Sequence, residues 1–527
     1  MCGILAVSLQ DGVSKINQVI TAFKLLANRG PDSGSLVITD SDILAFRRLA
    51  IVDTTVKGDQ PFYHNTSKLV CNGEIYNHTQ LKNKYKIPCD SNSDCDGLLY
   101  LFHRLGFRAM ISELNGVYAM VIMTPSRVYF ARDQIGIRPL FYGFLEDGSF
   151  ALASYARALL EFCPIVKQVP PGFGEFDIKS RKLSFSPHDH TPRLVRSVFP
   201  NLEVMIRSIL FRAVQTRLMS DRPVGCLLSG GLDSSLITSI LCKLIGPEKV
   251  RTYSIGMKGS QDLKYARMVA DYLGTDHTEV FFSPEEGFAA IPEVIRDLES
   301  YDITTIRASV GMWLLAKYVS QNTDDVVLLS GEGADELFCG YLYFHYAPNS
   351  EELAKESLRL VQELYLYDVL RADRCVSSHG LELRVPFLDK NLVKFCLSLS
   401  GELRKPKAGM EKSLLRESFM EGFLPEEVLY RRKEAFSDGV SGQKSWYRII
   451  QEFVETKVSD SVWEWNKDKF PSKEAYWYRT IYDGLFPNYQ PGYEYWLPRW
   501  TDCGGDPSAR VLSVYDKKTV YSKDGSF

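Results

Sequence analysis

Residues 227–235 read Leu227-Leu228-Ser229-Gly230-Gly231-Leu232-Asp233-Ser234-Ser235, and this stretch decides the fold of the longer part of the chain. An apolar β-type run, Pro223–Leu228, leads into it, and a helical pattern, Ser234–Leu244, follows. Glycines and serines in a strand-to-helix turn leave N–H groups and hydroxyls free, and the N-terminus of a helix favours an anion. The turn is therefore predicted to bind phosphate, the alternative being an ordinary Ser/Gly-rich turn. No Gly-Lys-Ser/Thr follows, which excludes a Walker loop.

The sequence beyond this turn alternates between β-type and helical patterns. Further β-runs are expected at Arg251–Ile255, His277–Phe282 and Asp325–Leu329, with helices between them, among them Leu263–Leu273. This alternation predicts an α/β domain with a doubly wound parallel sheet and helices on both faces. From about residue 350 to 500 the pattern is mostly helical, and residues 511–527 are expected to form a frayed tail.

The first 185 residues have a different rhythm, in which turns separate short β-type runs. Two helical patterns, at about Ile16–Leu26 and Gly97–Leu105, interrupt these runs. The runs are Gly3–Leu9, Ser35–Thr39, Ile43–Asp53, Lys68–Ile75, Gly116–Met123 and Arg127–Arg132. They predict sheet-dominated α+β layers. A polar, proline-flanked segment places a linker at 186–200, so that domains are expected at 2–185 and 201–510.

Composition narrows the class of protein. The 527 residues carry 62 lysines and arginines against 65 aspartates and glutamates, a formal charge of −3. This balance argues against a nucleic-acid partner or a polybasic membrane anchor. No apolar run approaches the ~18 residues of a membrane span, and the N-terminus lacks the pattern of a signal peptide. The 11 cysteines are scattered without a C-x-x-C pair, which favours a reduced, cytosolic protein over a disulfide framework.

The second residue, Cys2, is a candidate nucleophile. Removal of Met1 would leave Cys2 with a free α-amine, which can act as general base for the thiol of the same residue. The alternative is a plain second-position cysteine. Further along the chain, we expect strands to end at Arg48–Asp53, Asn72–Asn77 and Ser93–Asp96. They supply an arginine for a carboxylate, acids for an ammonium group, and Asn72 with the Gly73 N–H for an oxyanion hole.

In this order, these strings resemble a class II glutamine amidotransferase domain of the N-terminal-nucleophile hydrolase type, an αββα sandwich. Arg29-Gly30-Pro31-Asp32 fits the same family. The resemblance implies that Cys2 is the nucleophile and base. It also implies an oxyanion hole and a glutamine site made by Arg48, Asn72, Gly73, Glu74 and Asp94.

The string Ser-Gly-Gly-Leu-Asp-Ser resembles the pyrophosphate loop of enzymes that split ATP into AMP and pyrophosphate. A second glycine-rich loop, Ser330-Gly331-Glu332-Gly333-Ala334-Asp335-Glu336, follows another apolar strand and should lie beside the first. The resemblance implies Mg²⁺ ligation by Asp233 and Asp335. It implies ATP binding by Leu228, Ser229, Gly230, Gly231, Asp233, Ser234, Ser235, Ile255, Ser330 and Gly331.

With both halves in this order, residues 2–510 resemble the glutamine-hydrolysing asparagine synthetases. The motif sequences are most similar to those of animal-type members. The family implies that ATP activates aspartate as β-aspartyl-AMP, and that ammonia from glutamine then displaces AMP. Lys433 resembles a cation for the phosphates, Glu332 the acid tied to the intermediate, and Asp368 and Arg371 residues of the same pocket. Mg²⁺, small-molecule substrates, cytosolic location and a possible homodimer are further implications.

Three alternatives stay open. The same two-domain plan serves β-lactam-forming relatives, which tend to lose the N-terminal cysteine. A degenerate homologue acting as a binding partner would have at least one broken site, and none is seen. The family's apolar ammonia tunnel has Gly116–Val121 as a candidate lining, and an ordinary core strand is the other interpretation.

His188-Asp189-His190 is interpreted as solvated linker rather than as a metal site.

Overall fold

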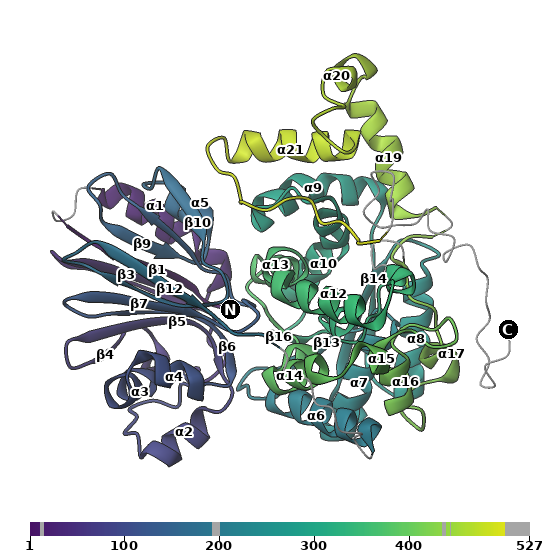
Figure 1. The fold of residues 1–527 in the computed structure, drawn as a ribbon, viewed down its shortest axis with the longest axis horizontal. Coiled ribbons are helices and arrows are strands. Elements are labelled where there is room, and N and C mark those ends of the chain that lie inside the picture. The colour runs from purple at the N-terminus through teal and green to yellow at the C-terminus, as the bar shows by residue number, and fades with distance from the viewer. Residues whose placement is uncertain (11–14, 192–200, 435–438, 443, 501–527) are drawn as a thin grey trace.

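The structure, a computed structural model of the chain, describes residues 1–10, 15–191, 201–434, 439–442 and 444–500. Two halves lie side by side, a sheet-rich half formed by the first part of the chain and a helix-rich half formed by the rest (Figure 1). The N-terminus lies where the halves meet. The expected tail at 511–527 and residues 192–200 of the expected linker are outside the described residues.

Two antiparallel sheets of six strands each form the first half. Strand order in the first sheet is β10 (Ile165–Gln168), β8 (Phe141–Phe144), β9 (Phe150–Ala153), β1 (Gly3–Ser8), β3 (Asp42–Arg48) and β2 (Ser33–Ile38). Strand order in the second is β12 (Lys182–Pro187), β11 (Gly172–Asp177), β7 (Arg127–Arg132), β6 (Gly116–Met123), β5 (Ser67–Ile75) and β4 (Phe62–His64).

The two sheets pack face to face, with helices on their outer faces. One core, which contains Ile4, Phe46, Val121 and Phe130, joins the inner faces of both sheets. On the outside of the first sheet lie α1 (Ile16–Leu25) and α5 (Ala156–Leu160). On the outside of the second lie α2 (His78–Tyr85), α3 (Leu98–Leu105) and α4 (Phe107–Glu113). This is the αββα sandwich that the family resemblance implied, and it confirms the α+β layers predicted from the β-type runs.

The second half is built on a parallel sheet of five strands, as the βα alternation predicted. Strand order is β15 (Asp276–Phe281), β14 (Arg251–Gly256), β13 (Val224–Leu227), β16 (Val327–Leu329) and β17 (Glu382–Arg384), and every pairing is parallel. The order reverses at β13, so that the loops after β13 and β16 share the crevice where open α/β sheets bind ligands.

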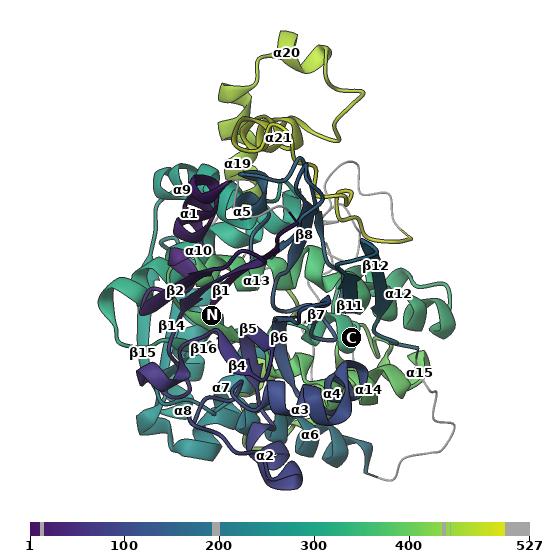
Figure 2. The ribbon, with the colours of Figure 1, turned by 90° about the vertical axis from the view of Figure 1, so that its left-hand side faces the viewer.

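Helices surround this sheet and dominate the C-terminal part. Those up to the second glycine-rich loop are α6 (Leu202–Thr216), α7 (Leu232–Ile245), α8 (Gln261–Leu273), α9 (Pro284–Leu298), α10 (Ile303–Asn322) and α11 (Ala334–Leu337). The next are α12 (Ser350–Glu363), α13 (Asp368–Ser377), α14 (Lys390–Ser398), α15 (Gly401–Arg404), α16 (Ser413–Ser418) and α17 (Glu426–Leu429). The last are α19 (Trp446–Lys457), α20 (Asp460–Glu464) and α21 (Lys473–Leu485), which project from the rest (Figure 2).

Several expected elements differ from the structure. The run Ile43–Asp53 is a strand only as far as Arg48, and the chain then turns, with Asp53 at φ 60°. Asp94 was expected at a strand end, but it lies in a turn before α3. β12 extends to Pro187, and His188 bonds to the Arg132 carbonyl (2.8 Å), so this part of the expected linker packs on the first half.

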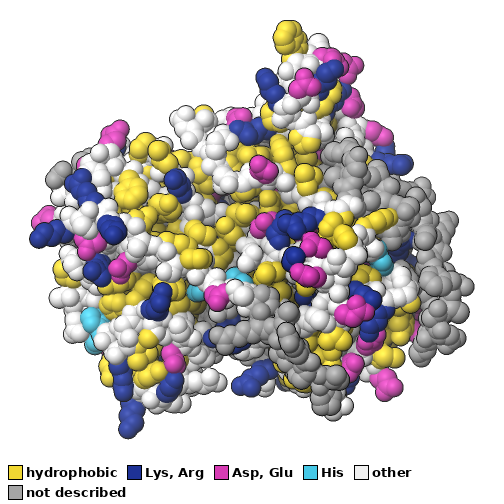
Figure 3. Space-filling view, in the orientation of Figure 1, with side chains coloured by type: hydrophobic (Ala, Val, Ile, Leu, Met, Phe, Trp, Pro, Cys, Tyr) yellow, Lys and Arg dark blue, Asp and Glu magenta, His cyan; other side chains and the backbone are white. Residues whose placement is uncertain are grey.

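Surface charge follows the near-neutral composition. On the face shown in Figure 3, positive and negative side chains are interspersed among apolar ones. None of the described helices has both the length and the apolarity needed to cross a bilayer.

Candidate active sites

Cys2 directly precedes β1 at the boundary between the halves. Its backbone N–H donates to Asn72 Oδ1 (2.9 Å), and Arg29 Nε donates to its carbonyl (2.8 Å). The thiol lies 3.8 Å from the Leu49 carbonyl, and burial raises its pKa to about 11. In the chain that still carries Met1, the free α-amine belongs to Met1, and Cys2 has no amine base of its own.

Asn72 and Gly73 lie beside Cys2 on β5. With its Oδ1 bound to the Cys2 N–H, Asn72 keeps a buried Nδ2 without a hydrogen-bond partner. A Cβ on Gly73 would come 2.2 Å from the Val117 carbonyl, so only glycine allows β5 to pair with β6 there. A donor left free beside a nucleophile is what an oxyanion hole requires.

Two buried carboxylates, those of Glu74 and Asp94, belong to the same predicted glutamine site. Asp94 accepts the Ile75 N–H (2.6 Å), and burial raises its pKa to about 6. Glu74 lies 3.3 Å from Arg384 Nη2, and burial together with Glu382 and Asp94 raises its pKa. These side chains give the site a negative end, which suits an ammonium group.

Arg48, the last residue of β3, holds a loop of its own half. Its Nη1 donates to the Thr55 carbonyl (2.6 Å) and to Asp59 (2.9 Å), and its Nη2 to the Asp53 carbonyl. The guanidinium thus already has partners, and a carboxylate from a ligand would have to share it.

The second site is a cavity of about 280 Å³ at the crevice of the parallel sheet. A Cβ on Gly331 would come 2.7 Å from the Ser234 amide nitrogen, so the two glycine-rich loops pack directly against each other, as the sequence indicated. The predicted residues that line the cavity are Leu228, Ser229, Gly231, Asp233, Ser234, Ile255, Ser330, Gly331, Glu332, Asp335, Asp368, Arg371 and Lys433. Gly230 and the buried Ser235 are the predicted ATP residues outside this lining.

A lysine that the sequence analysis did not identify, Lys412, also lines this cavity. Lys412 Nζ contacts Asp233 (2.5 Å) and Asp335 (2.8 Å), and Lys433 Nζ contacts the other oxygen of Asp335 (2.7 Å). Burial acts to raise the pKa of Asp335, but the two ammonium groups outweigh it and lower that pKa. Lys412 stands in Glu411-Lys412-Ser413, where nothing distinguishes it from a surface lysine.

A network of acids lines the same cavity. Arg371 Nη2 contacts both Glu332 (2.8 Å) and Asp368 (3.0 Å), so the expected i, i+3 pair forms on α13. Tyr341 donates to Glu336 (2.6 Å) and contacts Asp368 (3.3 Å). Burial, with Asp368 and Asp335, raises the pKa of Glu336 to about 8. The cavity therefore holds two clusters of paired charges, one of Lys412 and Lys433 with two aspartates and one of Arg371 with Glu332 and Asp368.

The donor set fits Mg²⁺ bound jointly with phosphates. Asp233 Oδ1 is buried without a hydrogen-bond partner, and Asp335 shares Lys412 with it. No group of three or more His, Cys, Asp or Glu side chains in the described part of the chain could hold a metal ion. Mg²⁺ commonly binds through one or two carboxylates plus substrate phosphates, and the two aspartates match that pattern.

Buried ion pairs join the halves next to Cys2. Arg29 contacts Asp373 (2.7 Å), and Arg138 contacts Glu382 (3.0 Å). Met1 is enclosed among them, with its sulfur 2.8 Å from Arg138 Nη1 and its amine 3.8 Å from Glu382.

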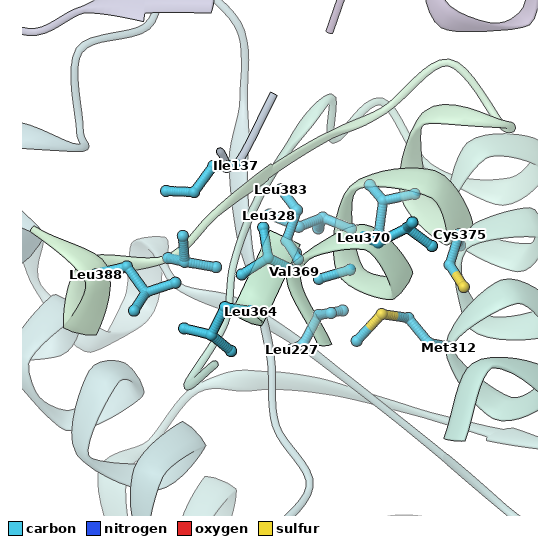
Figure 4. Packing of buried hydrophobic residues seen from close by; sticks show 14 of the residues in the cluster. Ile137, Leu227, Met312, Leu328, Leu364, Val369, Leu370, Cys375, Leu383 and Leu388 are labelled. Carbon is cyan, nitrogen blue, oxygen red and sulfur yellow. The ribbon is translucent and has the colours of Figure 1, made fainter. Parts of the chain in front are cut away.

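One apolar core cluster reaches from the first half to the lining of the cavity. Figure 4 shows buried side chains of this cluster, among them Ile137 of the first half and Leu383, Leu388, Val369, Leu370, Leu328, Leu227 and Met312 of the second. Leu227 and Met312 also line the cavity. The candidate tunnel lining Gly116–Val121 is divided among three clusters. Tyr118 and Met120 pack against α2–α4, and Ala119 and Val121 pack between the two sheets. Val117 is the one residue of this segment in the cluster shared by both halves.

Family models match both halves of this architecture. A glutamine amidotransferase domain matches residues 1–175, and asparagine synthase matches residues 205–360 and 347–502. Fold and sites thus define a glutamine amidotransferase joined to an ATP-utilising domain.

Full-length relatives narrow this class. Proteins named asparagine synthetase [glutamine-hydrolyzing] from Rattus norvegicus and Homo sapiens are each 42% identical to this chain, over 98% of it and 99% of their own length. The one from Gallus gallus is also 42% identical over the same shares. The chain belongs to the asparagine synthetase family.

Proposed function

We propose that this chain is a glutamine-hydrolysing asparagine synthetase. It converts ATP, L-aspartate, L-glutamine and water into AMP, diphosphate, L-asparagine and L-glutamate. The observation that carries the proposal is the occurrence in one chain of a Cys2–Asn72 pair and a two-loop phosphate cavity, joined by an apolar region.

At the first site, Cys2 attacks the side-chain carbonyl of glutamine. After loss of Met1, the Cys2 nitrogen that now bonds to Asn72 Oδ1 becomes the α-amine and accepts the thiol proton. Asn72 Nδ2 and the Gly73 N–H stabilise the tetrahedral oxyanion. Arg48 holds the glutamine carboxylate, and Glu74 and Asp94 hold its ammonium group. Ammonia leaves, and water then releases glutamate from the thioester.

At the second site, a carboxylate oxygen of aspartate attacks the α-phosphorus of ATP, and pyrophosphate leaves. The amides and hydroxyls of Ser229–Ser235, together with Lys433, balance the charge that develops on the phosphates. Leu228 and Ile255 flank the adenine, with Gly230, Gly231, Ser330 and Gly331 shaping the nucleotide site. Mg²⁺ held by Asp233 and Asp335 would supply further charge neutralisation.

Ammonia completes the reaction by attacking the acyl carbon of β-aspartyl-AMP, and AMP leaves. Glu332, which pairs with Arg371 next to Asp368, accepts the proton that the attacking nitrogen loses. The apolar residues between Ile137 and Met312 offer a route that favours neutral ammonia over ammonium ion. Domain boundaries at 2–185 and 201–510, a cytosolic location and a homodimer complete the proposal, the last from the family resemblance alone.

The test separates the two sites. Purified protein is incubated with ATP, Mg²⁺, aspartate and either glutamine or ammonium chloride, and asparagine and pyrophosphate are measured. Cys2→Ala should abolish synthesis from glutamine and leave synthesis from ammonia intact. Absence of asparagine with either nitrogen donor would refute the proposal, and pyrophosphate release with a different acceptor would favour the β-lactam-type alternative.

A further inference from the structure

Arg384 is the last residue of β17, the edge strand of the parallel sheet nearest the first half. Its side chain is fully buried. Nε donates to Glu382 (2.7 Å), and Nη1 donates to the carbonyls of Arg217 (2.7 Å) and Met219 (2.6 Å). These bonds fix the plane of the guanidinium and leave Nη2 directed at the other half of the molecule.

There, Arg384 Nη2 lies 3.3 Å from Glu74 Oε2. Glu74 belongs to β5 of the glutaminase half, and its Oε2 has no hydrogen bond, so Arg384 is its ion-pair partner among the described residues. A buried carboxylate that is to bind an ammonium group must stay ionised, and a neighbouring guanidinium favours the ionised form. The cation that does this for Glu74 comes from the other domain.

The main chain of the same residue supports the ATP cavity. The Ser330 N–H donates to the Arg384 carbonyl (3.0 Å), directly after β16 pairs with β17 through Leu329 and Arg384. Ser330 opens the second glycine-rich loop and lines the cavity. A shift of this loop on nucleotide binding therefore acts on the residue whose side chain faces Glu74.

We propose that Arg384 is a positioning residue that couples the two sites: it holds Glu74 ready for the ammonium group of glutamine, and it links this contact to the ATP loop. The inference rests on the proposed function, since it assumes that Glu74 binds glutamine. Coupling of this kind is reciprocal, so ATP-site occupancy and glutamine binding change each other's affinity by the same factor.

The charges around Glu74 make the proposed effect of Arg384 on glutamine binding dependent on pH. The groups that face Glu74 are Asp94, Glu382, Arg138 and Arg384, with the thiols of Cys2 and Cys95 close by. Burial and the two acids raise the pKa of Glu74, and the two arginines oppose this. Without Arg384 that pKa rises further, so that a larger fraction of Glu74 is neutral at a given pH, and a higher pH restores its charge.

The experiment compares Arg384→Met, Arg384→Lys and the control Arg217→Met in the full-length enzyme. Arg217 is an equally buried arginine at the same interface, paired with Asp389 and without contact to Glu74. Glutaminase KM and kcat are measured from pH 6.5 to 9, with and without a non-hydrolysable ATP analogue and Mg²⁺. Ammonia-dependent synthesis reports on the integrity of the second site.

Arg384→Met should raise the glutamine KM about tenfold at pH 7, within the ~5–150-fold range of site couplings, and the gap should narrow as the pH rises. The effect of the ATP analogue on KM should disappear, and Arg384→Lys should recover part of both. If Arg384→Met does not fold, Arg384→Lys decides, with a raised KM and unchanged ammonia-dependent synthesis expected.

Three results would overturn the proposal: a KM change equal to that of Arg217→Met, a KM gap that does not depend on pH, or an ATP-analogue effect that survives in both Arg384 variants. An ATP-analogue effect absent from the parent enzyme would also overturn it. Failure of the proposed function is separate, because the parent would then make no asparagine from ammonia.

Discussion

Lys412 offers the sharpest test of the ATP cavity. Its ammonium group is the shared partner of Asp233 and Asp335, and its side chain is 2% exposed. In Lys412→Met, Asp335 keeps Lys433 at 2.7 Å, whereas Asp233 loses its ion-pair partner. Breaking one buried pair costs about 3–5 kcal/mol. At about 2 °C per kcal/mol for a domain of this size, Tm should fall by about 6–10 °C in the absence of metal.

The assay is thermal unfolding with and without Mg²⁺, together with ammonia-dependent synthesis. Because a cation can take the place of Lys412 between the two aspartates, Mg²⁺ should restore several degrees in the variant and little in the parent. The control Lys407→Met removes an exposed lysine that pairs with Glu417, and it should change stability by less than about 1 kcal/mol. A variant that melts with the parent, or one that Mg²⁺ does not stabilise, would refute this account of the cavity.

Three further predictions concern the glutamine site and the interface. Asn72→Ala should lower kcat with glutamine about 10²–10³-fold and leave ammonia-dependent synthesis unchanged, because an oxyanion donor is lost; equal loss with both nitrogen donors would contradict this role. Since burial raises the pKa of Asp94 to about 6, glutamine KM should rise as the pH falls below that value, and Asp94→Asn should raise KM and flatten this part of the profile. Burial acts to raise the pKa of Asp373, but Arg29 and Arg138 outweigh it and hold it low, so its ion pairs stabilise the protein above pH ~4 and are lost as the pH falls through the folded-state pKa. Asp373→Asn should cost about 3–5 kcal/mol at pH 7 and less in acid, measured by urea unfolding at several pH values.

The sequence predicted the strand-turn-helix at Ser229–Ser235 and the strands that flank it because hydrophobic period and turn chemistry are local signals. It also led to Cys2 and Asn72, whose contact the structure shows at 2.9 Å. β17 was not predicted, because Glu382-Leu383-Arg384 has one apolar residue between two charged ones. β16 is equally short, but Val327–Leu329 is entirely apolar and was predicted. β8, β9 and β10, with four residues each, and β11 and β12, with six each, were not predicted either.

Lys412, Tyr341 and Arg384 could not be found in this way. Each acquires its role from partners far away in the sequence: Lys412 from Asp233, 179 residues earlier, and Tyr341 from Asp368, 27 residues later. A lone lysine or tyrosine carries no local pattern, and its burial depends on tertiary packing. Arg384 stands in Glu382-Leu383-Arg384, which could equally have been an exposed strand end.

The ion pairs at the domain boundary are best explained by orientation rather than by stability. Each of three pairs takes one residue from each half: Arg29 with Asp373, Arg138 with Glu382, and Glu74 with Arg384. Buried ion pairs recover little beyond their desolvation cost, and a purely apolar contact would hold the halves at least as firmly. An apolar contact, however, tolerates sliding, whereas bonds between paired charges define one register. If ammonia is to pass from Cys2 along the apolar cluster to Met312, that register is what keeps both ends of the route aligned.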